Sequence, residues 1–219
     1  VTEKLMEAVF EVDPAQKVEI WVTGSGDPFG SKIYRELLQK IDGRNHPNLI
    51  INLQTNGVML TPKMYDSMYK IHNNFGAIVV SFDAGIKDTY ENKTRLGGNW
   101  DILLKNCDYL STKCVDDDLD NGEIKLGFSF VVSSDNYKEM PTFIEMCDSK
   151  WGPSLPAGIS FTLILDWEVM PSEDFTQRAV WVPSHPEYNE FMEVLKHPAF
   201  KQKAVMFGNM RYLYEKANQ

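Results

Sequence analysis

Polar side chains follow each of five apolar runs in the sequence, where a parallel α/β protein would carry its chemistry. They are small hydroxyls, amides and carboxylates, at Thr23, Ser25 and Asp27, then Gln54, Thr55 and Asn56, then Ser81 and Asp83, then Ser133, Ser134 and Asn136, and last Asp166. The carboxyl ends of parallel strands share one edge of a sheet, so we expect these side chains to line a common rim. Such a rim suits a polar small molecule with an amino acid or ribose portion. No His or Cys lies at these positions, so the sequence does not indicate a hydrolytic or metal site.

Each candidate also has a purely structural interpretation. Asn56 with Gly57 is a common turn dipeptide, and Thr55 could satisfy a loose backbone group. Asp27 could cap the helix at residue 31, and Ser81 and Asp83 could cap the helix that follows them. Taken together on one rim, several of these residues are expected to contact a ligand.

The loop at residues 23–30, TGSGDPFG, indicates the sign of that ligand's charge. Its first two glycines match a dinucleotide-binding fingerprint, but Phe29 replaces the third glycine. Asp27 would place a negative charge where a pyrophosphate approaches, and Pro28 removes an N–H donor. We therefore expect the loop to attract an ammonium group, and an NAD-dependent oxidoreductase is the less favoured interpretation.

Strands and helices alternate along most of the chain. Strands are expected at residues 17–23, 48–57, 76–85, 124–134 and 158–167. Helices are expected at residues 2–10, 31–41, 61–71, 99–113 and 136–150. Because each helix would return the chain to the same edge of the sheet, the pattern predicts a parallel α/β fold. Residues 168–219 are rich in proline and aromatic residues, which predicts a short, irregular and partly helical C-terminal extension.

The amino-acid composition limits which binding partners and which cellular compartment are expected for the protein. The 22 basic and 31 acidic residues give a net charge of −9, which argues against a nucleic-acid backbone or an anionic membrane as main partner. No apolar run reaches the roughly 20 residues of a membrane helix. The three cysteines, Cys107, Cys114 and Cys147, are an odd and widely spaced set. They predict free thiols in a reducing, cytoplasmic compartment.

Five stretches of the chain match, in their order and spacing, the motifs of a known protein family: TGSGDPF, LQTNG, VSFDAG, TYENKTRLGGNWD and FSFVVSSDNYKEMPTF. In this order they resemble the radical S-adenosylmethionine enzymes, closest to the branch with a SPASM- or twitch-like C-terminal extension. The resemblance covers roughly residues 15–165, and the tail is also similar. It implies a partial (β/α)6 TIM-like barrel at residues 1–167, followed by an extension at residues 168–219.

The resemblance also implies S-adenosylmethionine as a cofactor and assigns residues to it. The family's G-G-E-P motif, which receives the methionine amino group, corresponds to Ser25, Gly26, Asp27 and Pro28, with aspartate in place of the usual glutamate. The other matching positions are Thr55 and Asn56 after one strand, Ser81, Asp83 and Arg95 near the cofactor's carboxylate and ribose, and Asn136 near its adenine and ribose.

The family's defining C-x3-C-x2-C motif, which binds a [4Fe–4S] cluster, is not in this sequence. Since the chain starts at Val1, we expect the cluster ligands and the first barrel strand to lie upstream, with no metal ligand in this chain. The implied reaction is reductive cleavage of S-adenosylmethionine to a 5′-deoxyadenosyl radical that acts on an unidentified small-molecule or peptide substrate. A flavodoxin or ferredoxin would donate the electron. The alternative is a non-catalytic, barrel-derived binding or scaffold protein without the cluster.

Overall fold

A computed structural model of the 219-residue chain describes residues 4, 7, 11–13, 16–23, 26–114, 124–152, 155–166, 168 and 170–219. Most of the helix predicted at residues 2–10 lies outside the described residues, and so does Ser25. None of the helices within these ranges is long and apolar enough to cross a membrane.

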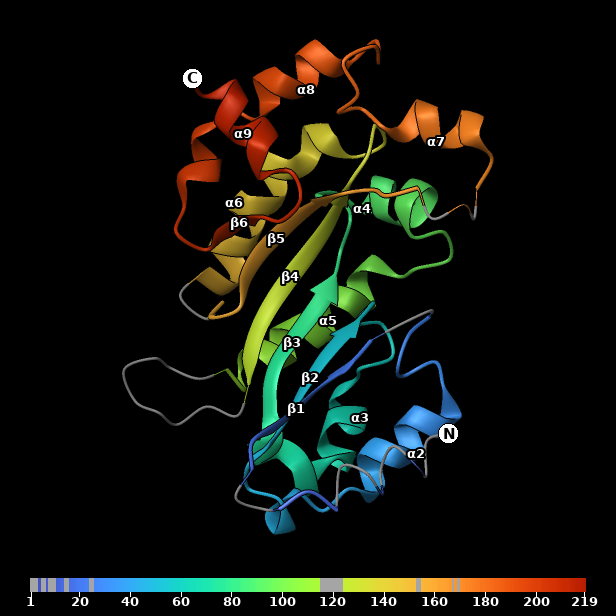
Figure 1. Ribbon diagram of the computed structural model, residues 1–219, viewed down its shortest axis with the longest axis vertical. Coiled ribbons are helices and arrows are strands. Elements are labelled where there is room, and N and C mark those ends of the chain that lie inside the picture. The colour runs from blue at the N-terminus through green and yellow to red at the C-terminus, as the bar shows by residue number, and fades with distance from the viewer. Residues whose placement is uncertain are drawn as a thin grey trace. The chain divides into compact units, whose positions relative to one another are not determined.

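Six strands form a sheet in the order β1-β2-β3-β4-β5-β6 (Figure 1). They are β1 Val18–Val22, β2 Leu49–Thr55, β3 Phe75–Ser81, β4 Lys125–Val132, β5 Gly158–Leu163 and β6 Val205–Phe207. β1 pairs with β2, β2 with β3 and β5 with β6, all in parallel. The predicted α/β class with a parallel sheet is confirmed.

Helices connect the strands. The α-helices are α2 Lys32–Lys40, α3 Pro62–Ser67, α4 Lys87–Thr89, α5 Trp100–Ser111, α6 Met140–Trp151, α7 Ser172–Arg178, α8 Tyr188–Val194 and α9 Arg211–Ala217. Two helices begin with a side-chain cap: the Ser31 hydroxyl accepts a hydrogen bond from Tyr34 N (3.4 Å), and the Thr61 hydroxyl accepts one from Met64 N (3.2 Å).

Three predicted boundaries were wrong. The helix predicted at 61–71 is α-helical only to Ser67 and continues as a 3-10 helix at Tyr69–Asn74. The strand predicted at 76–85 ends at Ser81, because Asp83 adopts φ +56°, which an extended strand does not allow. The strand predicted at 158–167 ends as β5 at Leu163.

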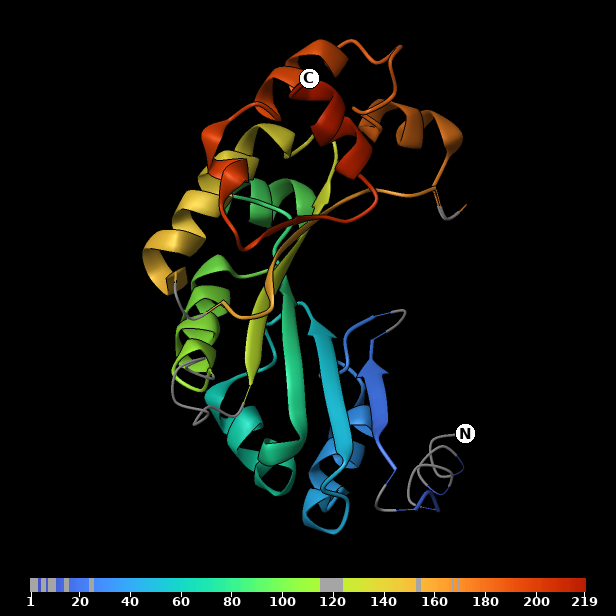
Figure 2. The same cartoon turned by 60° about the vertical axis from the view of Figure 1, so that its left-hand side comes forward.

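The chain divides into two compact units that interleave in sequence. Unit 1 comprises Val1–Ser81, Asp101–Gly127 and Ser154–Ala157, and unit 2 comprises Phe82–Trp100, Phe128–Pro153 and Gly158–Gln219. In unit 1, helices α2 and α3 lie on one face of strands β1–β3 (Figure 2). The predicted division between residues 167 and 168 stays a prediction.

Alternating side chains in unit 2 give its strands one aromatic face and one polar face. On β4 and β5, Phe130 and Phe161 are fully buried and lie 5.2 Å and 6.4 Å, centroid to centroid, from Phe143 of helix α6. The alternate positions on β5, Ser160 and Thr162, are small, polar and only half-buried. The helix-covered face is therefore the core, and the chemistry of unit 2 lies on the other face or at the strand ends.

Candidate functional site

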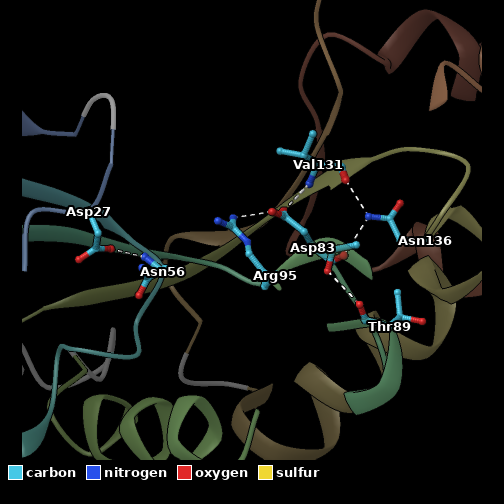
Figure 3. Close-up of polar contacts among 8 residues, drawn as sticks. Asp27, Asn56, Asp83, Thr89, Arg95, Val131 and Asn136 are labelled. Carbon is cyan, nitrogen blue, oxygen red and sulfur yellow. Dashed lines mark hydrogen bonds and ion pairs between the residues drawn. The ribbon is translucent and has the colours of Figure 1, made fainter. Parts of the chain in front are cut away.

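Asp27 forms the centre of a polar cluster in unit 1 (Figure 3). Its Oδ1 accepts a hydrogen bond from Phe29 N (2.9 Å), and its Oδ2 accepts from Thr55 Oγ1 (2.7 Å) and Asn56 N (2.6 Å). A carboxylate offers about four acceptor positions, so one position on Oδ1 stays available. Asp27 thus braces the glycine loop against the carboxyl end of β2 and keeps its charge at the loop.

The backbone around this brace is shaped by two glycines and one buried phenylalanine. Gly26 has φ +107° and Gly57 has φ +75°, both in the left-handed region that favours glycine. Phe29 is fully buried, and the Arg35 guanidinium donates to its carbonyl oxygen. Thr55 Oγ1, which donates to Asp27, also accepts from Gly57 N (3.1 Å). Residues 26–30, the second half of the loop, are therefore held by hydrogen bonds and by the burial of Phe29.

A small hollow adjoins the loop in unit 1. It measures about 200 Å³ and is lined by Val22, Thr23, Gly26, Asp27, Pro28, Ser31 and Tyr34. Pockets for whole drug-sized ligands measure roughly 300–1,000 Å³. The hollow by itself is therefore large enough for one polar group of a ligand, and Asp27 is its charged wall.

Asp83 forms the centre of a second cluster, in unit 2 (Figure 3). Its Oδ1 accepts from Val131 N (2.7 Å), and its Oδ2 forms an ion pair with the Arg95 guanidinium. Asn136 Nδ2 donates both to Asp83 O (2.9 Å) and to Val131 O (2.8 Å). Asp83 also has φ +56°, a strained value for a non-glycine residue that the surrounding hydrogen bonds stabilise.

Burial dominates the electrostatics of Asp83. Only 8% of the residue is exposed, and this desolvation raises the pKa of its carboxyl group above the usual range. The charge of Arg95 and the hydrogen bond from Val131 N–H act in the opposite direction but do not cancel the effect. Because the Arg95 side chain is 32% exposed, water screens part of its attraction for Asp83.

Arg95 follows a π-helical turn, Tyr90–Thr94, closed by a hydrogen bond from Arg95 N to Tyr90 O (2.8 Å). A tight turn with Gly97 at φ +80° comes next. Within the described part of the chain, the buried Nε of Arg95 has no hydrogen-bond partner. Leaving a buried donor unsatisfied costs about 1–3 kcal/mol, and an oxygen atom that reached this Nε–H would offset that cost.

Glu139 is a functional neighbour that sequence reasoning missed. Its Oε2 accepts from Gly85 N (2.8 Å) and Ile86 N (3.2 Å), and Thr89 donates its hydroxyl to Oε1. It holds the segment between Asp83 and helix α4. No sequence signal could have identified it, because its partners lie 50 to 54 residues away in the chain.

The structure brings the predicted site residues together in two groups. Asp27, Thr55 and Asn56 meet in unit 1, and Asp83, Arg95 and Asn136 meet in unit 2. Gly26 and Pro28 belong to the first group's loop, and Ser81 is buried at the end of β3.

The structure bears out one of the purely structural roles considered for these residues and contradicts two others. Thr55 does satisfy a backbone group, that of Gly57. The proposed helix-cap role of Asp27 is wrong, since Ser31 caps α2. The same role for Asp83 is also wrong, since α4 begins after Ile86 without a side-chain cap.

The three cysteines are free thiols, as predicted. Burial raises the pKa of the Cys107 and Cys114 thiols, which keeps them protonated at neutral pH. In the described ranges, no three His, Cys, Asp or Glu side chains gather as metal ligands would. Comparison of the chain with protein-family models and with curated protein sequences gives no match.

Proposed function

We propose that the chain binds S-adenosylmethionine at the carboxyl ends of its strands, as part of an enzyme of the radical S-adenosylmethionine type with a partial (β/α)6 barrel. The buried, unpartnered Nε–H of Arg95 is the observation that carries this proposal. It is a cationic donor beside the hydrogen-bonded carboxylate of Asp83 and amide of Asn136, and such a donor suits a ligand carboxylate. The ordered motifs described from the sequence support the same cofactor.

In unit 2, the proposed role of Arg95 is to donate to the carboxylate of the cofactor's methionine portion. Asp83 is the positioning residue, because its ion pair with Arg95 Nη2 fixes the guanidinium, while Nε has no hydrogen-bond partner among the described residues. Asn136 fixes Asp83 through its carbonyl oxygen, which keeps the guanidinium in place. The preformed arrangement lowers the ordering cost of binding.

In unit 1, the proposed role of Asp27 is to accept a hydrogen bond from an ammonium group. One acceptor position on Oδ1 is available, and the adjoining hollow has space for such a group. Gly26, with no Cβ and φ +107°, lets a ligand approach the backbone closely.

The cysteines described here do not fit an iron–sulfur cluster. Cys107 and Cys147 are buried and Cys114 is half-buried, and no other metal-ligating side chains gather with them among the described residues. A cluster would need ligands beyond these residues. S-adenosylmethionine, once bound and reduced, supplies hydrogen-abstraction chemistry; the residues of this chain bind and orient it and exclude water. The substrate, the flavodoxin- or ferredoxin-type electron donor and a cytoplasmic location belong to the same proposal.

Calorimetric titration with S-adenosylmethionine tests the binding. Arg95→Lys keeps the positive charge but removes the Nε–H, and losing one charge-assisted hydrogen bond should weaken binding by about 10- to 100-fold. Arg44→Gln is the matched control, because Arg44 pairs with Asp42 on the surface of the protein. Its affinity should equal that of the wild type.

The same experiment separates the alternatives. No heat of binding with S-adenosylmethionine, or equal affinity in Arg95→Lys, contradicts the proposal. Binding of NAD instead would support the oxidoreductase interpretation. For catalysis, the full-length protein is reconstituted anaerobically with iron and sulfide, and 5′-deoxyadenosine is measured by chromatography. Cofactor binding without iron uptake or 5′-deoxyadenosine would indicate the non-catalytic binding protein.

A further inference from the structure

We propose that a second cleft in unit 2 binds a ligand that presents uncharged amide groups. The cleft measures about 360 Å³ and lies between Ser134, just after β4, and residues 176–187, which comprise the end of α7 and the connection to α8. It shares no residue with the Asp83 cluster. The inference therefore goes beyond the proposed function and does not depend on it.

Backbone hydrogen bonds hold the walls of the cleft in place. Ser134 N donates to Arg178 O (3.0 Å), which ties the end of β4 to the end of α7. The His185 ring spans the segment: its Nε2 lies 2.9 Å from Gln177 O, and its Nδ1 accepts from Glu187 N (3.1 Å). Nδ1 is thus the acceptor and Nε2 the donor of a neutral ring. The cleft is preformed, so a ligand need not order it.

Three uncharged polar side chains face the cleft with their hydrogen-bonding capacity unused. The side chains of Ser134, Gln177 and Ser184 line it and form no hydrogen bond with the residues that the structure describes. A glutamine amide and a serine hydroxyl can each donate and accept. An amide group in a ligand has the same pairing of one donor and one acceptor, so it can use both kinds of capacity at once.

The charge of the lining argues against anions. No Lys or Arg occurs among the described residues that line the cleft, and its ionised member is Glu187. Glu187 is 3.4 Å from Lys138 Nζ, which reduces its attraction for a cation. A phosphate or carboxylate would find no cationic side chain among the described lining residues. The electrostatics therefore favour a neutral ligand.

The apolar part of the lining argues against nucleobases. Val182 and Pro186 form this part, and the described lining includes no Phe, Tyr or Trp. Nucleobases bind proteins largely by stacking on such rings. Aliphatic walls instead suit a small aliphatic side chain beside the amide. The volume is near the lower end of the usual 300–1,000 Å³, which fits one or two amide units.

Two sources could supply this chemistry, a peptide backbone or a small carboxamide. Titration of the ¹⁵N-labelled protein, followed by NMR, distinguishes them. N-acetyl-dialanine N-methylamide is the peptide probe and isobutyramide the small-molecule probe. We expect saturable shifts of the backbone amide signals of Ser134, Gln177 and Ser184 with at least one probe, and the tighter probe identifies the source. No S-adenosylmethionine is added, so failure here is distinct from failure of the proposed function.

Variants connect the binding to the cleft. Gln177→Leu removes one hydrogen-bonding group from an exposed position and should weaken binding about three- to tenfold. Gln202→Leu, outside the cleft, is the matched control and should leave the affinity unchanged. Ser184→Ala is a second variant of an exposed cleft residue, and it should also weaken binding of the probe. Absence of saturable shifts, preferential binding of glucose or phosphate, or wild-type affinity in both variants would overturn the inference.

Discussion

Replacing Asn136 by alanine should destabilise the protein strongly, although the residue lies in no regular strand. The Asn136 side chain is 2% exposed and makes three hydrogen bonds. Its Nδ2 donates to Asp83 O and Val131 O, and its Oδ1 accepts from Ser133 N at 2.8 Å. All three partners are backbone groups at the end of β4 or just after β3. Asn136→Ala leaves each of them without this partner.

The size of the effect follows from these contacts. An unsatisfied buried N–H, that of Ser133, costs about 1–3 kcal/mol. Each carbonyl oxygen loses one of its hydrogen bonds, worth about 0.5–1.5 kcal/mol. We therefore expect the free energy of unfolding to fall by about 3 kcal/mol. In a chain of this size that lowers Tm by about 6–12 °C.

Urea unfolding followed by circular dichroism measures this change. Asn189→Ala is the control, since Asn189 is exposed on helix α8, and its effect should stay within about 0.5 kcal/mol. Asn136→Asp adds a test of the contacts themselves. At neutral pH its carboxylate faces two carbonyl oxygens and is unfavourable, whereas the protonated acid at low pH can donate to one of them. An Asn136→Ala protein as stable as the Asn189→Ala control would refute this reasoning.

Three further predictions follow from other parts of the structure. Gly57 has φ +75°, and Gly57→Ala would place a methyl group 2.6 Å from a core side-chain carbon, so this variant should lower the free energy of unfolding by about 2–4 kcal/mol. Gly97 has φ +80° with nothing within 4 Å, so Gly97→Ala is the comparison and should lower it by about 1–2 kcal/mol. Urea unfolding measures both. The raised pKa of Asp83 means that the folded protein holds this proton more tightly than the unfolded chain. The free energy of unfolding of the wild type, relative to that of Asp83→Asn, should therefore fall as pH rises from about 4 through that raised pKa. Urea unfolding of both proteins across this pH range measures the difference. A difference between the two proteins that does not change with pH would contradict this prediction. Burial and a hydrogen bond to a carboxylate raise the pKa of Tyr137 to about 12, so ultraviolet titration should show a late-ionising tyrosine that Tyr137→Phe removes.

Much of the fold could be predicted because its strands are long, apolar and separated by amphipathic helices. β2 and β4, of seven and eight residues, stand out in the sequence on these grounds alone. β6 could not be predicted, since it has only three residues and its pairing with β5, such as Ile159 with Val205, is a tertiary contact. The π-helical turn at Tyr90–Thr94 was missed for a related reason: one shifted hydrogen bond defines it, and side-chain patterns do not report it.

The sequence predicted which polar residues follow the strands, but it did not predict the contacts that they make. Parallel topology places the strand ends on one rim, so Asp27 and Asn136 could be identified from position alone. Their partners could not, because Asp27 reaches Asn56 N, 29 residues away, and Asn136 reaches Asp83 O, 53 residues away. Contacts at such separations depend on how elements pack, which local sequence does not encode. The left-handed backbone of Asp83 is likewise imposed by its surroundings.

Asp27 shows how contacts can explain which acidic residue occupies a loop position. Its Oδ1 reaches Phe29 N two residues ahead, the short-range geometry that an aspartate forms readily in a turn. A glutamate at this position has one more methylene group and forms no such turn. The short side chain therefore shapes the loop, while Oδ2 anchors it to β2 and the unused acceptor position keeps a negative charge toward the hollow. Asparagine would lose the charge and glutamate the turn, so aspartate is the residue that meets both requirements.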